Sequence, residues 1–553
     1  MSPSIAAGFN HLRLKYPGDE NGLLFQGLSF SALQGEKVLL LGPSGCGKST
    51  ALQVLSGLVP RTIELPMKAD AIIVPDRSGY VFQDPDAQFC MPYVDEELAF
   101  VLENVSVPRE QMDGIIKGLL DTVGLKLRES HTLIQTLSQG MKQRLAVAAA
   151  LALEPDVLFL DEPTALLDTE GTRQVWDTIK RTSGDKTVLI VEHKIDEIID
   201  WVDRVAVMGP DGTWLADGSP RDIFASHREL FKAYGIWYPG VWEDRMEISP
   251  LREFGTGYRR NGTERATGFE LASRNKDEAS RDKDEASRDK DEASRDKDDA
   301  SRNKDEASRD KDEASSLVAA STSSGGNPVL LQMENFKGFR GIGGTAKITV
   351  DRLNASAGEW ISVIGKNGAG KSSLLLAIMR LIRTEGLCLV RGKERKKVVQ
   401  LADYASFVFQ NPEFQFVAGT VESEIAFSLP ASLSKDEKER RIHDILESFH
   451  LLPLIDKHPY ALSMGQKRRL SVAVSIERGQ KLLLLDEPTF GLDARNTFSM
   501  LERLERLRED GAAIIMITHD ENIVRHYSTR IWRVEEGHLA ELAVTEEAPV
   551  LCN

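Results

Sequence analysis

The chain has 553 residues, a formal net charge of −16, 41% hydrophobic residues and 28% charged residues, so we expect an ordinary core-forming protein with more than one domain. The negative charge argues against general binding to nucleic acid or anionic lipid, and no apolar run approaches the roughly 18–20 residues of a membrane span. The first residues lack a signal-peptide pattern, and four scattered cysteines exclude a disulfide scaffold and a zinc module.

Five sequence elements follow one another in the first half of the chain and recur in the same order in the second half. In the first half they are GPSGCGKST (42–50), VFQDP (81–85), LSQGMKQRL (137–145), VLFLDEPT (157–164) and TVLIVEH (187–193). In the second half they are GKNGAGKSS (365–373), VFQNP (408–412), LSMGQKRRL (462–470), LLLLDEPT (482–489) and AIIMITH (513–519). Matched residues are separated by 323 to 327 positions, so the chain contains an internal duplication.

Short apolar runs such as KVLLLG and DVLFLD alternate with helical patterns in both copies. This alternation predicts an α/β fold with a mainly parallel sheet, in which ligands bind at the carboxyl ends of the strands. We predict a first domain over 1–235, an extension and linker over 236–327, a second domain over 328–545 and a tail over 546–553.

Six heptads of the type SRDKDEA occupy residues 273–314 of the predicted linker. Alanine is the only apolar residue in each heptad, so a coiled coil is excluded. Favourable i,i+4 pairs such as Asp284 with Arg288 would support a solvated helix. The like-charge pair Glu285 with Asp289, and the lack of anything to bury, favour disorder. In either state the segment is a tether.

The strongest motif is G-x-x-x-x-G-K-[ST], which follows an apolar strand and precedes a helical pattern in both copies. Its backbone N–H groups and the helix N-terminus can surround the phosphates of a nucleotide. We expect Lys48 and Lys371 to reach the β- and γ-phosphates, and Ser49 and Ser372 to bind Mg²⁺.

Each copy also has an Asp-Glu pair at the end of an apolar strand. We expect Asp161 and Asp486 to hold Mg²⁺, directly or through water. The neighbouring Glu162 and Glu487 are placed to orient or deprotonate the attacking water.

The LSQGM and LSMGQ segments precede helical patterns, with Ser138 and Ser463 at the predicted N-caps. Together with the phosphate loop, glutamine, DEPT and histidine in this order, they resemble the nucleotide-binding domain of ATP-binding cassette (ABC) proteins. The resemblance covers about 1–235 and 328–545. It implies an ATPase with two tandem cassettes, each a P-loop domain with a mainly parallel sheet and a helical subdomain.

The resemblance further implies that the two cassettes pair head to tail within the chain, with ATP and Mg²⁺ bound between them. Site one would join Lys48, Gln83, Asp161, Glu162 and His193 to Ser463, Gly465 and Gln466; site two would join Lys371, Gln410, Asp486, Glu487 and His519 to Ser138 and Gly140. The expected catalytic residues are Glu162, Glu487, His193, His519, Gln83 and Gln410. The expected metal site residues are Ser49, Gln83, Asp161, Ser372, Gln410 and Asp486. The expected ATP-binding residues are Gly42, Pro43, Ser44, Gly45, Cys46, Gly47, Lys48, Ser49, Thr50, Gly365, Lys366, Asn367, Gly368, Ala369, Gly370, Lys371, Ser372, Ser373, Ser138, Gly140, Ser463, Gly465, Gln466 and Tyr16.

Five residues in or beside this pattern carry separate expectations. Asp168 and Asp493 resemble the loop that couples the two sites. Tyr16 is either the aromatic residue that stacks on adenine or a strand-end surface residue, and Phe339 is the corresponding candidate in the second half. Cys46 lies in the first phosphate loop, where a nearby lysine and helix N-terminus could lower its pKa; otherwise it is simply a small residue that fits.

The two LSxG segments depart from the usual LSGGQ of the family at Gln139, Met141 and Met464. The serine and the second glycine are kept in both. We therefore expect both sites to hydrolyse ATP, and we expect site two, which uses LSQGM, to be the weaker if the sites differ.

The glutamine of each copy continues as QDPDAQF and QNPEFQF, followed by VDEELAF and VESEIAF. This pattern resembles the ATPases of energy-coupling-factor (ECF) importers, which take up vitamins, their precursors or transition-metal ions. The fused pair is similar to the ATPase of hydroxymethylpyrimidine/thiamine-type systems. The resemblance places Gln88 and Gln415 near a groove for a transmembrane coupling subunit, and it implies a second, small substrate-binding membrane protein.

The alternative is a soluble two-cassette ATPase that acts on ribosomes as a translation factor. Its linker should be an amphipathic hairpin with basic and apolar faces, whereas the SRDKDEA heptads are acidic and lack an apolar face. We therefore expect an ATPase subunit on the cytoplasmic face of the cell membrane, with membrane partners and no nucleic acid.

Overall fold

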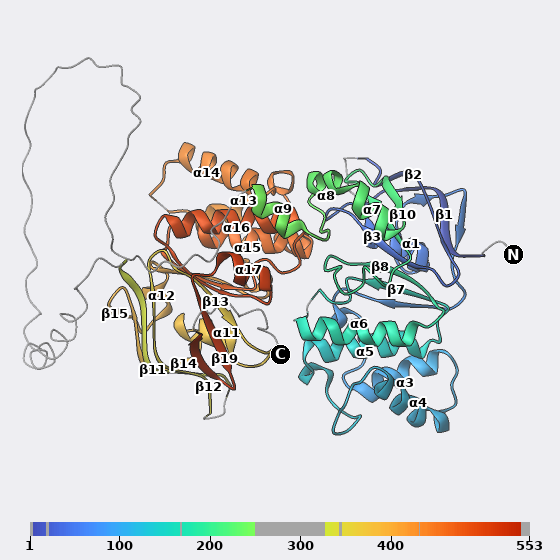
Figure 1. Ribbon diagram of the computed structural model, residues 1–553, viewed down its shortest axis with the longest axis horizontal. Helices are drawn as coiled ribbons and strands as arrows, with labels where there is room; N and C mark the ends of the chain where they lie inside the picture. The colour runs from blue at the N-terminus through green and yellow to red at the C-terminus, as the bar shows by residue number, and fades with distance from the viewer. Residues whose placement is uncertain are drawn as a thin grey trace, which may run out of the picture. The chain divides into compact units, whose positions relative to one another are not determined.

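The computed structural model describes residues 4–17, 22–165, 167, 169–248, 327–341, 345–430 and 432–542 (Figure 1). The heptads at 273–314, Asp168 and the predicted tail lie outside these residues, as does most of the predicted linker. The expectation of two tandem P-loop cassettes, each with a largely parallel sheet and a helical subdomain, is confirmed. The domain boundaries given above stay a prediction.

The first cassette contains a six-stranded sheet in the order β10-β9-β3-β8-β7-β6. All neighbours in it are parallel except β10, which is antiparallel to β9. The strands are β3 (Lys37–Leu41), β6 (Ser78–Val81), β7 (Val157–Asp161), β8 (Thr187–Val191), β9 (Arg204–Met208) and β10 (Trp214–Gly218). Every residue of β7 and β8 is buried, as expected for a parallel sheet that is covered on both faces.

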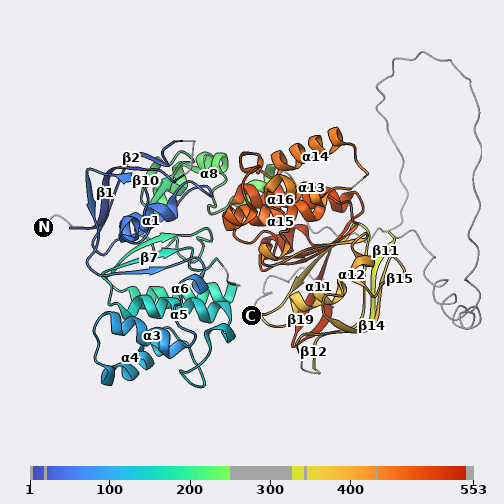
Figure 2. The same cartoon turned by 180° about the vertical axis from the view of Figure 1, so that it is seen from behind.

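A second, antiparallel sheet in the first cassette is formed by β1 (Ile5–Leu14), β2 (Phe25–Leu33), β4 (Met67–Lys68) and β5 (Ala71–Ile73). The helices of the first cassette are α1 (Lys48–Ser56), α2 (Leu58–Arg61), α3 (Val94–Asn104), α4 (Arg109–Thr122), α5 (Gln139–Ala152), α6 (Thr169–Ser183), α7 (Pro220–Ser226) and α8 (Arg228–Tyr234), and α9 (Val241–Ile248) follows them along the chain. Helices α3 and α4 lie beside α5 and form the helical subdomain (Figures 1 and 2).

The second cassette repeats this plan, but its two sheets join into one of ten strands because β12 pairs with β20. The strands are β11 (Val329–Phe339), β12 (Ala346–Ser356), β13 (Trp360–Ile364), β14 (Arg383–Val390), β15 (Lys393–Glu394), β16 (Ala405–Val408), β17 (Leu482–Asp486), β18 (Ala513–Ile517), β19 (Arg530–Glu535) and β20 (His538–Leu542). The helices are α11 (Lys371–Ile378), α12 (Val398–Leu401), α13 (Val421–Ser428), α14 (Lys435–Ser448), α15 (Met464–Ile476), α16 (Ala494–Glu509) and α17 (Glu521–Tyr527).

The described residues of both cassettes form one compact unit. The segment after α8 contributes to the core of the second cassette, where the ring of Trp242 meets Phe498 edge-on at 4.8 Å between centroids. Trp237 Nε1 donates a hydrogen bond to the carbonyl of Leu492 at 3.0 Å. Aromatic residues that follow the first cassette along the chain are therefore packed on the second.

The buried strand β17 supports the Asp-Glu pair of the second cassette, and Leu484 at its centre is fully buried. We expect Leu484→Ala to lower the free energy of unfolding of this cassette by about 2–5 kcal/mol, because it removes apolar contacts and leaves a cavity. Urea titration of the full chain measures this change. The matched control is Val399→Ala, at a side chain that is 81% exposed, and it should alter stability by less than about 0.5 kcal/mol.

Candidate functional site

The phosphate loop of each cassette joins a central strand to a helix, β3 to α1 and β13 to α11. The residue before the helix is a glycine in the left-handed region, Gly47 at φ 106° and Gly370 at φ 117°. A Cβ at Gly370 would also come within 2.5 Å of the Lys347 carbonyl oxygen, so only glycine suits this turn.

The lysines of both loops fold back onto their own loop. Lys48 Nζ donates to the carbonyls of Gly42 and Pro43, both at 2.9 Å, and Lys371 Nζ donates to the carbonyl of Gly365 at 2.6 Å. Both lysines are about 6% exposed. Each ammonium group is thus hydrogen-bonded to the start of its own loop, and its binding to phosphate stays a prediction.

Cys46 is 1% exposed, and burial raises the pKa of its thiol in spite of the nearby Lys48. The hypothesis of a lowered pKa is therefore wrong. A Cβ at Gly42 would lie 2.8 Å from the Cys46 sulfur, which shows how closely the small thiol fits inside the loop.

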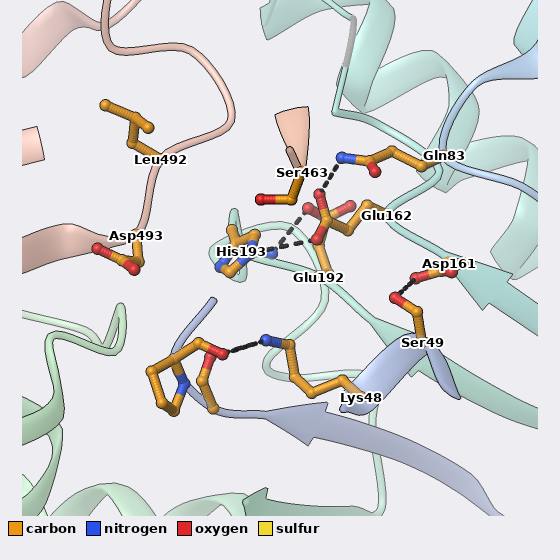
Figure 3. A network of polar contacts seen from close by, with 12 residues as sticks. Lys48, Ser49, Gln83, Asp161, Glu162, Glu192, His193, Ser463, Leu492 and Asp493 are labelled. Carbon is orange, nitrogen blue, oxygen red and sulfur yellow. Dashed lines mark hydrogen bonds and ion pairs between the residues drawn. The ribbon is translucent and has the colours of Figure 1, made fainter. Parts of the chain in front are cut away.

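The carboxylate at the end of β7 is hydrogen-bonded on both oxygens. Ser49 Oγ donates to Asp161 Oδ1 at 2.8 Å, and Tyr80 Oη donates to Asp161 Oδ2 at 3.1 Å (Figure 3 shows Ser49 and Asp161). Burial, together with the charge of Glu162, raises the pKa of Asp161 to about 6, although the hydrogen bonds from Ser49 and Tyr80 and the charge of Lys48 act in the opposite direction.

The neighbouring Glu162 lies at the centre of a polar network (Figure 3). It accepts a hydrogen bond from Gln83 Nε2 at 2.7 Å and forms an ion pair with His193 Nε2 at 3.2 Å. Its backbone is in the left-handed region, at φ 47°, a conformation that costs energy for a residue with a side chain. The fold thus maintains an unfavourable backbone conformation at the residue whose carboxylate contacts both the glutamine and the histidine.

The second cassette reproduces only part of this network. Ser372 hydrogen-bonds the Asp486 carboxylate, Glu487 has φ 51°, and His519 Nε2 lies 3.3 Å from Glu487 Oε1. Burial raises the pKa of Asp486 to about 6. Gln410, however, is exposed, whereas its counterpart Gln83 is half-buried against Glu162.

The ion pair in the first cassette shifts the pKa values of both Glu162 and His193. Burial alone would raise the pKa of Glu162, but His193 and Lys48 lower it. Burial alone would lower the pKa of His193, but Glu162 raises it. The charged pair therefore persists from the lowered pKa of the glutamate to the raised pKa of the histidine.

The serines of the LSxG segments are N-caps, as expected from the sequence. Ser138 Oγ accepts from the Met141 N–H at 3.3 Å at the start of α5, and Ser463 Oγ accepts from the Gln466 N–H at 3.4 Å at the start of α15. Gln466 also accepts from the Ser463 N–H at 3.0 Å. Gly140 and Gly465 follow in the first turn of these helices.

Three further residues with separate expectations are Tyr16, Phe339 and Asp493, and of these Tyr16 lies beside a phosphate loop. Tyr16 is 40% exposed, and its hydroxyl lies 2.7 Å from Thr50 Oγ1, next to the first phosphate loop. Phe339 packs under the guanidinium of Arg383 at 4.9 Å. Asp493 caps α16 through the Asn496 N–H at 2.9 Å.

Gln88 and Gln415 brace the helical subdomains from inside. Gln88 Nε2 donates to the Ala146 carbonyl at 3.2 Å, and Gln415 Nε2 donates to the Ser471 carbonyl at 3.0 Å. Each glutamine thus ties the loop after its strand to the long helix that follows the LSxG segment.

The sequence did not single out two polar residues that stand close to these carboxylates, Tyr80 and Arg468. Arg468 on α15 is 3% exposed and interacts electrostatically with Glu487 and Asp486. The other cassette has a different residue at each matched position: Phe407 in place of Tyr80, and Gln143 in place of Arg468. The signal for both residues in the sequence is that the two halves differ at these matched positions.

The serine and aspartate pair of each cassette fits Mg²⁺, which prefers oxygen ligands and uses one or two carboxylates together with substrate phosphates. In the second cassette, Asp486 Oδ1 is buried without a hydrogen-bond partner among the described residues, as an oxygen reserved for a cation would be. No group of three or more histidine, cysteine or acidic side chains able to hold a metal is found in the part of the chain that the structure describes. Among the same residues, no helix is long and apolar enough to cross a membrane.

The family model described as "ABC transporter" matches residues 25–165 and 349–490. The chain belongs to this family. Because proteins of the family bind and hydrolyse ATP, the chain is an ATPase.

Relatives of similar length align along almost the whole chain. The chain is 33% identical over 550 residues to a protein of Bacillus subtilis (strain 168) named as an HMP/thiamine import ATP-binding protein, covering 96% of this chain and 90% of that one. It is 31% identical over 549 residues to an ABC transporter ATP-binding protein of Methanosarcina mazei, covering 96% and 88%. Among solved structures, an RNase-L inhibitor matches 97% of this ABC protein and 91% of its own chain at TM-score 0.56 and 18% identity. A complex of an archaeal ribosome recycling factor gives the same TM-score and identity. At such identity the likeness shows the two-cassette fold alone.

The Glu162–His193 pair leads to a prediction for this ABC protein. In Glu162→Gln the pKa of His193 should fall, because the carboxylate that raises it is gone while the burial that lowers it stays. Histidine resonances followed by NMR against pH measure the change, with His193→Gln used for assignment. Glu36→Gln, remote from this histidine, should leave its titration unaltered; an unchanged pKa in Glu162→Gln would contradict the ion pair.

Proposed function

We propose that this ABC protein is the ATP-hydrolysing subunit of an ECF-type importer for a vitamin, a vitamin precursor such as hydroxymethylpyrimidine or thiamine, or a transition-metal ion. The observation that carries the proposal is the pattern Q-x-P-x-x-Q-F followed by V-x-x-E-[IL]-A-F, which occurs once in each cassette at matching positions. The import ATP-binding protein of Bacillus subtilis, similar along 96% of the chain, supports it.

In the proposed mechanism, the loop backbone, Lys48 and Lys371 bind the phosphates of ATP. Ser49 with Asp161, and Ser372 with Asp486, would hold Mg²⁺, which supplies positive charge to the β- and γ-phosphates. The lysines give up their loop carbonyls for phosphate oxygens when ATP binds. This exchange keeps each ammonium hydrogen-bonded in both states.

Glu162 and Glu487 are the proposed general bases, oriented by His193 and His519. Gln83 and Gln410 sense the nucleotide at the start of the segment that leads into the helical subdomain. The LSxG serines and glycines of the opposite cassette complete each site. Two bound ATP molecules then close the cassettes, and hydrolysis removes the γ-phosphate and reopens them.

The proposed docking surface for the transmembrane coupling subunit lies beside Gln415. It consists of Phe414, Val417 and Phe427, which are 76%, 69% and 73% exposed, and of Tyr460, which is 51% exposed. Large apolar side chains exposed to this degree are expected where a partner covers them. The surface would place the chain at the cytoplasmic face of a membrane, bound through other subunits.

Co-purification from membranes tests this assignment. The tagged chain should recover a transmembrane coupling subunit and a small substrate-binding membrane protein, and Val417→Ser combined with Phe427→Ser should reduce this recovery at least roughly tenfold, since apolar anchors dominate interface energy. Val399→Ser, at an equally exposed apolar residue on α12, is the control that should keep full recovery. Recovery of ribosomes instead of membrane proteins would replace the importer with the translation factor.

A second experiment addresses the two sites. Both are expected to hydrolyse ATP, and site one, with Glu162, is expected to carry more of the turnover than site two. Loss of a general base lowers the rate at its own site by roughly 10²–10⁴-fold, so Glu162→Gln should reduce steady-state ATPase more than Glu487→Gln. If only the Glu487→Gln change abolishes ATPase and transport, the order of the sites is reversed.

A further inference from the structure

The aspartates at the ends of β7 and β17 occupy matching positions but have different neighbours. Tyr80 on β6 corresponds to Phe407 on β16, so the hydroxyl that bonds Asp161 Oδ2 has no equivalent in the second cassette. Both rings lie beside a phenylalanine, with centroids 4.5 Å from Phe82 and Phe409 respectively, at interplanar angles of 44° and 77°. The difference thus removes one hydrogen-bond donor and keeps an aromatic ring at this position.

A second difference occurs on the helix that begins in the LSxG segment, five positions after its N-cap serine. Gln143 on α5 and Arg468 on α15 are 2% and 3% exposed. Gln143 Nε2 lies 3.5 Å from the Phe82 carbonyl, and Arg468 Nη1 donates to the Phe409 carbonyl at 3.0 Å. Both side chains therefore reach the backbone immediately before the glutamine of their own cassette, one neutral and one positively charged.

The arginine is a buried cation beside buried carboxylates. Its interaction with Glu487 and Asp486 is electrostatic, and its Nε has no hydrogen-bond partner among the described residues. A charge in such a place acts at long range because little water screens it. It compensates the two carboxylates, and by the same field it opposes any further cation that binds to them.

We propose that Tyr80 and Arg468 are positioning residues that support the metal carboxylates of their cassettes by different means, so that the second site couples a divalent cation to ATP more weakly than the first. In the first cassette a neutral hydroxyl orients Asp161 with no charge added. The second cassette lacks that hydroxyl, and the buried guanidinium of Arg468 instead adds a permanent positive charge that acts on Asp486 and Glu487. The inference rests on the proposed magnesium site, and it adds a difference between the two sites that does not depend on the LSxG segments.

The test measures the binding of a fluorescent, non-hydrolysable ATP analogue to the full chain with Mg²⁺ and with EDTA. Lys371→Ala leaves only the first site able to bind the analogue, and Lys48→Ala leaves only the second. For each site, the dissociation constant in EDTA divided by the dissociation constant in Mg²⁺ reports how strongly the cation is coupled to nucleotide binding. The ratio should be larger at the first site by about threefold to tenfold, from one extra charge near the cation. Tyr80→Phe should reduce the first-site ratio by about tenfold, the usual effect of losing a residue that orients a metal ligand.

The two halves supply matched variants that exchange the residues. Arg468→Gln should raise the second-site ratio, Gln143→Arg should lower the first-site ratio, and Arg468→Lys, which keeps the charge, should leave the second site weak. Phe407→Tyr, which supplies the hydroxyl that the second cassette lacks, should raise the second-site ratio. Each variant installs a side chain that the other cassette accommodates, and thermal melting confirms that it folds.

If the two sites have equal ratios and the substitutions do not change them, the inference is overturned and the magnesium assignment stays intact. Nucleotide binding that is indifferent to Mg²⁺ at both sites would overturn the magnesium assignment and the inference with it.

Discussion

Two adjacent carboxylates at the end of a fully buried strand are the constraint on which each cassette depends. Burying a negative charge is costly unless hydrogen bonds or opposite charges compensate it. In the first cassette the compensation for Asp161 and Glu162 comes from the phosphate loop, the neighbouring strand, the glutamine loop and the histidine at the end of β8. These segments must all converge at one edge of the sheet, and the parallel strand order β3-β8-β7-β6 brings them there.

The two cassettes meet this constraint differently. The first uses neutral donors on Asp161 and a histidine and a glutamine on Glu162. The second keeps the serine and the histidine, adds a buried arginine, and leaves one oxygen of Asp486 without a hydrogen-bond partner among the described residues. One fold, present twice, therefore contains two electrostatic environments for the same chemistry.

Most of the candidate site could be predicted because its motifs are short and contiguous. The phosphate loops, the Asp-Glu pairs and the capping serines lie where their patterns indicated, since each depends on local backbone geometry. The raised pKa of Cys46 could not be predicted, because burial, a property of the packed fold, outweighs the nearby Lys48. Nor could the exposure of Gln410, because an identical VFQ segment in the first cassette carries a half-buried glutamine.

The sequence by itself determined that the chain is a duplicated α/β nucleotide-binding protein, because glycine spacing, strand hydrophobicity and helix caps act over a few residues. Only the tertiary structure decided which side chains surround each carboxylate. Tyr80 lies 81 residues before Asp161, and a contact across that separation depends on strand pairing rather than on any local pattern. The same holds for Arg468, which becomes part of the second site because α15 packs against β16 and places a charged side chain inside the protein.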